Sequence, residues 1–573
     1  MLATPYDVET TKKPDGETDY HLTDAALKAG WVKLAFQTNN FNDGDLHTWL
    51  SGEVYGDTAL VDLVKWPSYI ALVIFIVLSY FAGIKDGKRT LALLRGQRTD
   101  GTEAVAVAQF NRRMRRRKKV SGPLRDGVIF LDAAQSWLSR ILGDKASRGV
   151  HVPLEREPHH VVFMGDTGSG KTAAIRQVLL QVEGRGELAI VYATAEYVEQ
   201  LSDPQRGDII LNPLDGRCPF YSLCDEIEDD AEALTVAASL FPDRDHENRF
   251  FVDAPRRIFA YLLCLRPTPE ELVHWLIHPA EIDRRVRGTE LESMIATDAP
   301  AQRKGVLASL SMIADALKLL PRQDEAKGHF STAAWAKQRR GWIFITSTPE
   351  TRVALRPLIS LWIDLLVLRL MRTGAASGQK TWFVLDELHS LQRLPQLATA
   401  LTETRKANVV MLLGFQGRAQ IVDLYGPLAE ALLSQPATKL FFRTSDPDAA
   451  DWISRAIGAV EYLRPRVSRS RQLHGQGTES EQGEIVREPL VIGSRIMGLE
   501  PLEAYFKHGL YAVHLWIKYI ELSSRQPAFI PRSRISVRKM LEAGQAPQSF
   551  PASTSAEQHL APESSTQQQQ FFE

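Results

Sequence analysis

One stretch of this 573-residue sequence constrains the fold more than any other. The apolar run from His160 to Met164 leads into a glycine-rich turn, Gly-Asp-Thr-Gly-Ser-Gly-Lys-Thr, that ends at Lys171 and Thr172. The turn satisfies the pattern G-x-x-x-x-G-K-[ST], and residues 173–180 after it are compatible with a helix. A strand, a glycine-rich loop and a helix in this order are typical of a phosphate-binding loop, although a chance match in a Gly/Ser/Thr loop is the alternative.

The residue types in this loop suit a bound polyphosphate. Backbone N–H groups can converge on phosphate oxygens only where side-chain bulk is small, and the N-terminus of the next helix favours negative charge. We expect Lys171 to reach the β and γ oxygens of ATP, and the Thr172 hydroxyl to bind Mg²⁺. The expected nucleotide-binding residues are Gly165, Asp166, Thr167, Gly168, Ser169, Gly170, Lys171 and Thr172.

Length and charge narrow the class of protein. A chain of this length is too long for one ordinary core, so two or more domains are expected. The formal net charge of −1 means that any nucleic-acid surface must be a local patch. Cys218, Cys224 and Cys264 have no recognised metal spacing, and their odd number argues against a disulfide framework. We expect reduced, structural thiols.

The segment 66–84 carries no charged residue and is long enough for one transmembrane helix. Trp66, Tyr69 and Tyr80 would lie towards the membrane interfaces. A buried helix of a soluble core is the alternative, which the apolar residues on every face disfavour. Residues 85–119 hold twelve Lys/Arg against three acids, so this side is expected to be cytoplasmic and the tail 1–65 periplasmic. The basic linker 85–150 could also contact lipid headgroups or DNA phosphates.

The remaining chain alternates between strand and helix patterns. This alternation is typical of a parallel sheet covered on both faces, and it assigns residues 151–224 and 336–530 to one nucleotide-binding domain. Strand signals vanish over residues 225–335, which predicts an all-α insert. Residues 464–487 are expected to form a mobile loop, and 545–573 a disordered tail. The predicted strands are Val161–Met164, Leu188–Tyr192, Asp208–Leu211, Trp342–Thr346, Thr381–Leu385, Val409–Leu413 and Thr438–Arg443, with β-like runs at Leu490–Ile492 and Leu510–Trp516.

The strand Thr381–Leu385 ends in two acids. We expect Asp386 to hold Mg²⁺ and Glu387 to deprotonate the attacking water, the alternative being an ordinary acidic helix N-terminus. Gln416 follows the next strand, where an amide can sense the γ-phosphate. Arg405 and Arg443 are the arginines best placed to face a phosphate of the same or a neighbouring subunit.

Taken together, these motifs resemble the type IV coupling proteins of bacterial conjugation, the TraD-like membrane ATPases. The resemblance runs from about residue 66 to 520 and rests on the phosphate loop, on Asn212-Pro-Leu-Asp, on Asp386-Glu387, and on Gln416 with Gly426 shortly after. It implies a RecA-like P-loop NTPase domain that carries an all-α domain. It also implies that Lys171 and Thr172 bind nucleotide and Mg²⁺, that Asp386 and Glu387 are the Walker B pair, that Gln416 is a sensor, and that Arg405 is an arginine finger.

The resemblance further implies function and partners. Such proteins form hexameric rings on the bacterial inner membrane, with the ATPase domain in the cytoplasm, and recruit relaxase-bound DNA to a type IV secretion channel. Alternatives are a protein-effector receptor that uses ATP as a switch, or an FtsK-like DNA translocase. The family usually has two membrane helices near the N-terminus, whereas only 67–84 is convincing here. Either an external tail replaces the first helix, or Ala25–Phe36 is a degenerate membrane-associated segment.

Overall fold

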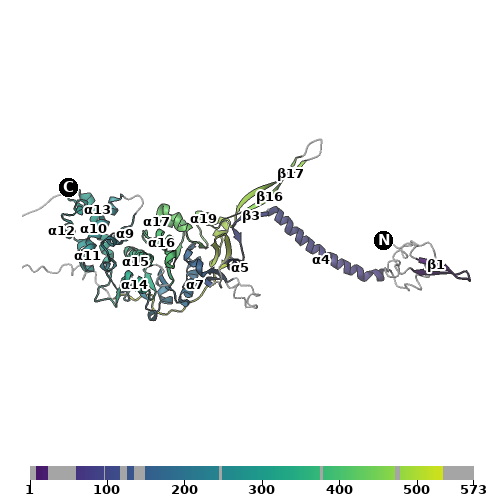
Figure 1. Cartoon of the computed structure of the whole chain (residues 1–573), viewed down its shortest axis with the longest axis horizontal. Coiled ribbons are helices and arrows are strands. Elements are labelled where there is room, and N and C mark those ends of the chain that lie inside the picture. The colour runs from purple at the N-terminus through teal and green to yellow at the C-terminus, as the bar shows by residue number, and fades with distance from the viewer. Residues whose placement is uncertain are drawn as a thin grey trace, which may run out of the picture. The chain divides into compact units, whose positions relative to one another are not determined.

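The computed structural model describes residues 8–22, 60–95, 97–116, 126–133, 149–243, 248–373, 379–470 and 478–532 (Figure 1). Contacts divide the chain into two units: residues 1–100 with 461–487, and residues 101–460 with 488–573. Most of the expected periplasmic tail, including Ala25–Phe36, lies outside the described residues, and so does the whole expected disordered tail 545–573.

A ten-stranded sheet forms the centre of the larger unit as described, in the order β4-β19-β18-β15-β7-β14-β13-β8-β12-β9. The seven strands from β9 to β15 in this order are parallel, and each overlaps one of the seven strands predicted from the apolar runs. Strands β18 and β19 add antiparallel pairs at one side. The bounds are β4 Glu103–Ala104, β7 Val161–Met164, β8 Leu188–Ala193, β9 Ile209–Leu211, β12 Ile343–Thr346, β13 Thr381–Leu385, β14 Val409–Phe415, β15 Thr438–Phe441, β18 Glu503–His508 and β19 Tyr511–Trp516.

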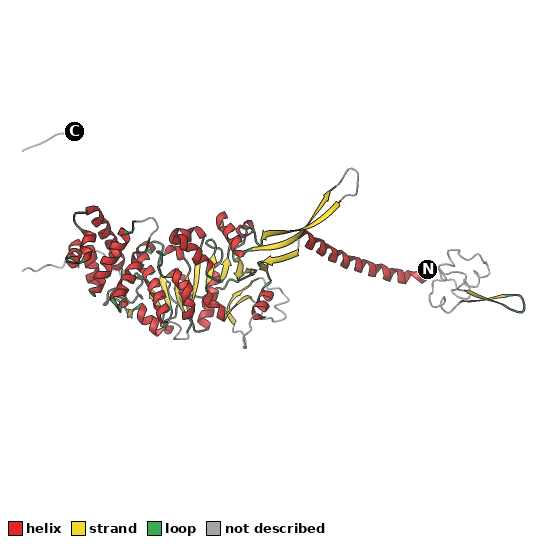
Figure 2. Cartoon of the chain, turned by 45° about the horizontal axis from the view of Figure 1, so that its top comes forward, coloured by secondary structure: helices red, strands yellow, loops and turns green. Residues whose placement is uncertain are grey.

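Both faces of the sheet are buried. Successive side chains of β7 divide between two cores, with Val162 and Met164 in one and Val161 and Phe163 in the other, as the period of two along a strand requires. Helices cover both faces (Figure 2), and this coverage is why the parallel strands are apolar at most positions. Helices in the first core are α15 Arg352–Thr373, α16 Leu397–Glu403, α17 Arg418–Tyr425, α18 Ala429–Ser434 and α19 Pro447–Ile457, and those in the second are α5 Val107–Arg116, α7 Lys171–Gly184 and α8 Glu196–Leu201.

Between β9 and β12 the chain is mainly helical. The helices α9, α10 and α13 lie within residues 225–335, where the sequence predicted an all-α insert, and their apolar residues continue the first core of the sheet. The short strands β10 and β11 pair in parallel where the chain enters and leaves this helical insert. The bounds are β10 Phe220–Tyr221, α9 Asp230–Leu240, α10 Phe250–Cys264, α11 Pro269–Ile277, α12 Pro279–Val286, α13 Pro300–Leu317, β11 His329–Phe330 and α14 Thr332–Gln338.

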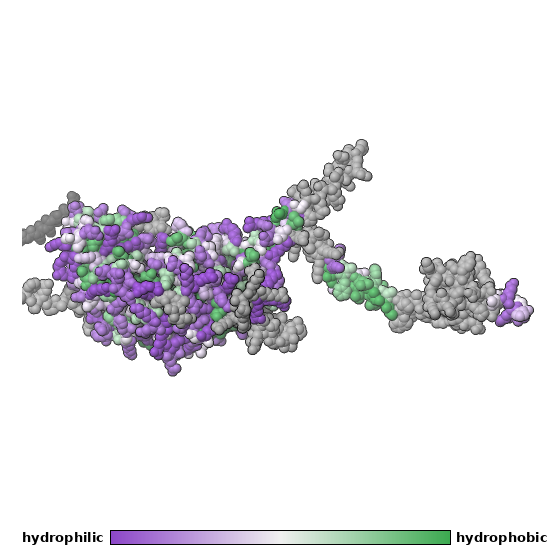
Figure 3. Space-filling view, viewed as in Figure 1, coloured by the Kyte–Doolittle hydropathy of each residue, from purple (hydrophilic) through white to green (hydrophobic). Residues whose placement is uncertain are grey.

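The smaller unit contains one long helix, α4 Leu60–Arg95. Its segment Tyr69–Asp86 has a mean hydropathy of 1.8 and none of it is buried (Figure 3), so it is long and apolar enough to cross a membrane. The exposed apolar residues from Tyr69 to Ile84 are not those of a packed core helix. The hairpin of β1 Val8–Lys12 and β2 Thr18–Leu22 precedes this helix in sequence.

Two predictions were wrong, one of a loop and one of a strand. The stretch 464–487, expected to be a loop, lies mostly in β16 Ala459–Ser470 and β17 Thr478–Pro489, which form a sheet with β3 Gln97–Gly101. Backbone pairing, rather than an alternating apolar pattern, makes these polar segments strands. The apolar run Leu490–Ile492, expected to be β-like, instead leads into the short helix α20 Gly493–Met497.

Candidate active site

The phosphate loop joins the end of β7 to the start of α7. Gly168 and Gly170 have φ angles of 75° and 119°, in the left-handed region that favours glycine. A Cβ at Gly165 would lie 2.6 Å from the Cβ of Phe442. The loop is therefore a narrow turn whose curvature depends on glycine, and this is the form of backbone that cradles a polyphosphate.

Lys171 is the first residue of α7, and its side chain is buried. Its Nζ donates to the carbonyl oxygens of Gly165 and Asp166, at 2.5 and 2.9 Å. Burial lowers the pKa of Lys171, whereas Asp386, Asp166 and Glu387 act to raise it. The ammonium group therefore lies inside the loop and close to the acids that follow β13.

Asp386 and Glu387 follow β13 at the carboxyl edge of the sheet. Strand β14 lies between β13 and β7. The two acids therefore follow the strand that is second from β7 in the sheet, and not its direct neighbour. Burial raises the pKa of Asp386, against a hydrogen bond from Tyr197 and the charge of Lys171. Glu387 forms an ion pair with Arg352, at 2.8 Å between Oε2 and Nη1.

Tyr197 was not anticipated from the sequence. It lies on α8, is buried, and its hydroxyl donates to Oδ2 of Asp386 at 3.1 Å. The side chain of Thr172 acts on the same hydroxyl and lowers its pKa. Tyr197 thus contacts Asp386 and lies near Thr172, the two residues expected to hold Mg²⁺. A lone tyrosine after a strand carries no motif, so only the fold reveals this contact.

The close fit between β14 and β13 depends on Gly414. A Cβ at this position would lie 2.5 Å from the carbonyl oxygen of Asp386. Gln416 follows directly after the end of β14, at the same edge of the sheet as the loop and the two acids, and is partly exposed. The structure thus brings Lys171, Asp386 and Gln416 to one edge.

The two candidate arginines lie at opposite edges of the sheet. Arg443 follows β15, and its carbonyl oxygen accepts a hydrogen bond from the N–H of Asp166 at 2.8 Å. Arg405 is exposed and precedes β14, so it lies at the amino edge, away from the loop of its own chain. There it adds to the burial that lowers the pKa of His160 to about 4.

A second residue that the sequence did not reveal is Leu502, just before β18. Its N–H donates to the carbonyl oxygen of Ser169 at 2.8 Å. A Cβ at Gly170 would lie 3.0 Å from the Cα of Leu502, so this backbone covers one side of the loop. The φ of Leu502 is 70°, a strained value for a leucine, and such strain persists only where the surroundings enforce it.

The Asn212-Pro-Leu-Asp segment has a structural role in this fold. Asp215 is buried and pairs with Arg217 at 2.7 Å, and its Oδ2 accepts from the N–H of Ile530 at 3.2 Å. Arg217 also donates to the carbonyl oxygens of Pro527 and Ala528. The segment therefore fastens residues 526–532 to the end of β9.

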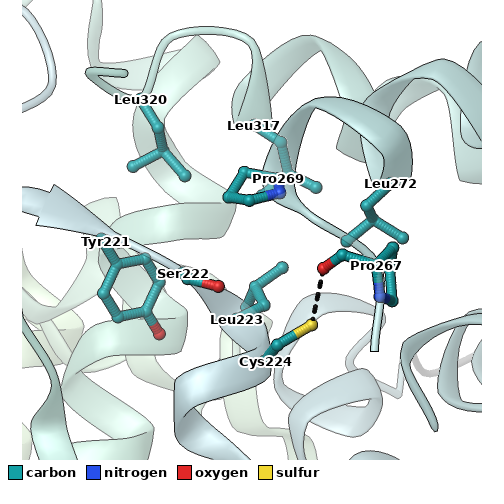
Figure 4. A pocket seen from close by; sticks show the side chains of 9 residues that line it. All are labelled: Tyr221, Ser222, Leu223, Cys224, Pro267, Pro269, Leu272, Leu317 and Leu320. Atoms are coloured by element: carbon teal, nitrogen blue, oxygen red, sulfur yellow. Dashed lines mark hydrogen bonds between the residues drawn. The ribbon is translucent and has the colours of Figure 1, made fainter. Parts of the chain in front are cut away.

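The cavity in the helical insert is too small for a nucleotide. It measures about 10 Å³ and is lined by residues that include Tyr221, Cys224 and Leu317 (Figure 4). The Cys224 thiol faces the carbonyl oxygen of Pro267 at 3.0 Å, and burial raises its pKa to about 11, partly offset by Arg266. All three cysteines are free, in agreement with the sequence, and no cluster of three metal-binding His, Cys, Asp or Glu side chains occurs among the described residues.

Known proteins are similar to this chain in sequence and in fold. A family model described as the type IV secretion-system coupling protein DNA-binding domain matches residues 145–513. The coupling protein TraD of Escherichia coli (strain K12) is 29% identical over 400 residues, which cover 66% of this chain and 55% of TraD. The conjugal transfer protein TraG of Agrobacterium fabrum is 30% identical over 128 residues, 22% of this chain and 19% of TraG. The chain thus spans about half the length of TraD and less of TraG.

The solved structures agree with the sequence relatives. The bacterial conjugative coupling protein TrwB, in its unbound monoclinic form, has a TM-score of 0.64 and 26% identity, and the match covers 76% of this chain and 97% of that one. A TrwB structure with the ATP analogue ADPNP gives the same score and covers 98% of the TrwB chain. Because the family model covers more than half of the sequence, this chain belongs to the type IV secretion-system coupling proteins.

Proposed function

We propose that this protein is a membrane-anchored ATPase that couples DNA to a type IV secretion channel. The observation that carries the proposal is the cluster at the carboxyl edge, where a glycine loop with a buried Lys171 lies close to Asp386 and Glu387. The TrwB complexes with ADPNP and with ADP and Mg²⁺ support the same ligands here.

The residues present fit ATP and Mg²⁺. The loop has no room for a Cβ at Gly165, and it presents its backbone to a phosphate. Thr172 and Asp386 would hold Mg²⁺, which prefers oxygen ligands and keeps several waters. When bound, the metal would neutralise charge on the phosphates. Glu387 would accept the proton of the attacking water, Lys171 would hold the β- and γ-phosphates, and Gln416 would sense the γ-phosphate.

The quaternary part of the proposal is a homo-hexameric ring. Arg405 is exposed and lies away from the loop of its own chain, so as a finger it could serve only the site of a neighbouring subunit. The partners would be DNA, relaxase proteins and the secretion channel. The helix α4 would anchor the chain in the bacterial inner membrane, with the basic linker and the ATPase domain in the cytoplasm and the N-terminal tail outside.

Two variants of the purified full-length protein in detergent test the ATPase part. Lys171→Ala should abolish binding of MgATP, and Glu387→Gln should bind it but turn it over at least about a hundredfold more slowly, since general-base catalysis contributes about that much or more. Lys337→Ala and Glu430→Gln, which remove paired surface charges, are the matched controls. Wild-type turnover in Glu387→Gln would refute the assignment of the base.

The DNA part has its own test. The hydrolysis rate of the wild-type protein should rise when single-stranded or double-stranded DNA is added. A rate that does not respond to DNA, together with binding of a secreted protein, would favour an effector receptor instead.

A further inference from the structure

The carboxylate expected to act as the base is held by an arginine. Oε2 of Glu387 lies 2.8 Å from Nη1 of Arg352, and both side chains are partly exposed, at 29% and 23%. His389 lies 3.7 Å from the other carboxylate oxygen, but burial lowers its pKa, so this ring is neutral near pH 7. The guanidinium of Arg352 is therefore the positive group that pairs directly with Glu387, while the charge of Lys171 also acts on it.

This pair orients Glu387 towards α15. Arg352 is the first residue of that helix. While Oε2 accepts from the guanidinium, the lone pair of that oxygen that faces Arg352 is not free to take a proton from water. The Nε of Arg352 is buried and has no hydrogen-bond partner among the described residues, so the guanidinium keeps an unused donor.

The first turn of α15 is followed by a proline. Pro357 lies inside the helix, one turn after Arg352. A proline removes the hydrogen bond to the carbonyl oxygen four residues earlier and crowds that turn, which weakens the connection between the first turn and the rest of the helix.

The remainder of α15 is fixed to the helical insert. The buried Asp364 accepts hydrogen bonds from Ser239 of α9 and from the N–H of Gln396. Arg369 is also buried and pairs with Glu232 of α9 at 3.1 Å. A displacement of the helical insert would therefore move the part of α15 that follows Pro357 relative to the first turn, which carries Arg352.

We propose that Arg352 is a positioning residue that restrains Glu387, and that hydrolysis requires this ion pair to open through a shift of the first turn of α15. The inference rests on the proposed ATPase and deepens it, because it gives the helical insert a route to the base. In the protein without DNA, Arg352 lowers the rate of MgATP hydrolysis. It leaves the binding of MgATP unchanged.

The test is the basal rate of MgATP hydrolysis without DNA. Arg352→Ala should raise kcat about fivefold, the factor that loss of an ion pair of about 1 kcal/mol gives, and KM should stay unchanged. Arg352→Lys, which can still pair with Glu387, should restore the low rate. Arg356→Ala, one turn further along the same helix, is the matched control and should behave like wild type.

Further variants separate the possible failures. Arg352→Ala combined with Glu387→Gln should be inactive, which shows that the gain passes through Glu387. An Arg352→Ala protein that keeps the wild-type Tm and is no faster than wild type would overturn the restraint. If Arg352→Ala lowers the Tm, Arg352→Gln takes its place under the same criterion. If wild type, Arg352→Ala and Glu387→Gln all bind MgATP and none of them hydrolyses it, the proposed function is wrong, and so is the restraint that rests on it.

Discussion

The hydroxyl of Tyr197 donates to Oδ2 of Asp386 at 3.1 Å. The side chain of Thr172 lies near the same hydroxyl and acts to lower its pKa. Burial and the charge of Asp386 keep the pKa of Tyr197 well above its ordinary value, so the hydroxyl stays protonated and remains a donor. The position of the Asp386 carboxylate, one of the two groups expected to bind Mg²⁺, therefore depends on a buried side chain of α8.

Replacing Tyr197 with phenylalanine should weaken the apparent affinity for Mg²⁺ in ATP hydrolysis. A hydrogen bond to a charged group contributes about 1.5 kcal/mol, so about tenfold more Mg²⁺ should be needed for half-maximal rate, while the ring still fills the core. Tyr425→Phe is the control, because this buried tyrosine accepts from the N–H of Leu394 outside the loop and acids described above. An unchanged Mg²⁺ titration would show that Tyr197 only fills space.

Gly414→Ala should disrupt the site by changing the packing of β14 against β13. The new Cβ would lie 2.5 Å from the carbonyl oxygen of Asp386, so β13 and β14 must move apart. Overpacking of this kind costs about 1–3 kcal/mol, and we expect a lower Tm together with loss of ATP hydrolysis. Gly417→Ala, with no atom within 4 Å of its Cβ, is the control. A Gly414→Ala protein with wild-type Tm and rate would contradict the close approach.

The sequence predicted the centre of the fold well because its signals are local. A strand buried on both faces is a continuous apolar run, as at Val161–Met164, and the phosphate loop is contiguous in the chain. Strand β18, Glu503–His508, was missed because Glu, Lys and His make up half of its six residues and leave no apolar run longer than three residues. Strands β16 and β17 were missed because their sequence is rich in charged residues and Ser and has no sustained alternation of apolar and polar residues.

The site was predicted where its residues follow strands, and missed where the fold brings them in from elsewhere. Asp386 and Gln416 are read from strand ends, since parallel strands place those ends at one edge. Tyr197, Arg352 and Leu502 reach the same edge from a helix, from the start of another helix and from the loop before β18. No residue-type pattern marks them, because their roles arise from packing between segments far apart in the sequence.

The buried Asp364 should make stability depend on pH. Burial raises its pKa to about 6, against hydrogen bonds from Ser239 and from the N–H of Gln396. The folded chain therefore holds this proton to higher pH than the unfolded chain does. The stabilisation is fully present below about pH 4 and is lost as the pH rises through about 6, by about 3 kcal/mol at most.

Asp364→Asn isolates that contribution. The amide cannot ionise, so relative to wild type the variant should gain stability as the pH rises from about 4 to 6.5. The measurement is the difference in Tm between the two full-length proteins across this range. A difference that does not change with pH would show that Asp364 keeps an ordinary pKa in the fold.

The last prediction concerns the contacts by which Asp215 and Arg217 hold the segment 526–532. Arg217→Ala removes the partner of Asp215, whose side chain is 1% exposed, and also removes the bonds to Pro527 and Ala528. Removing one partner of a buried pair costs about 3–5 kcal/mol, and here the cost is relieved by release of the segment. Trypsin should then cleave after Arg525 at least about tenfold faster than in wild type, because cleavage follows local opening.

Arg303→Ala, which breaks a two-bond pair with Asp283 in the helical insert, should leave that rate unchanged. Equal cleavage rates in wild type and Arg217→Ala would mean that other contacts, such as the pair of Arg525 with Glu183, hold the segment by themselves.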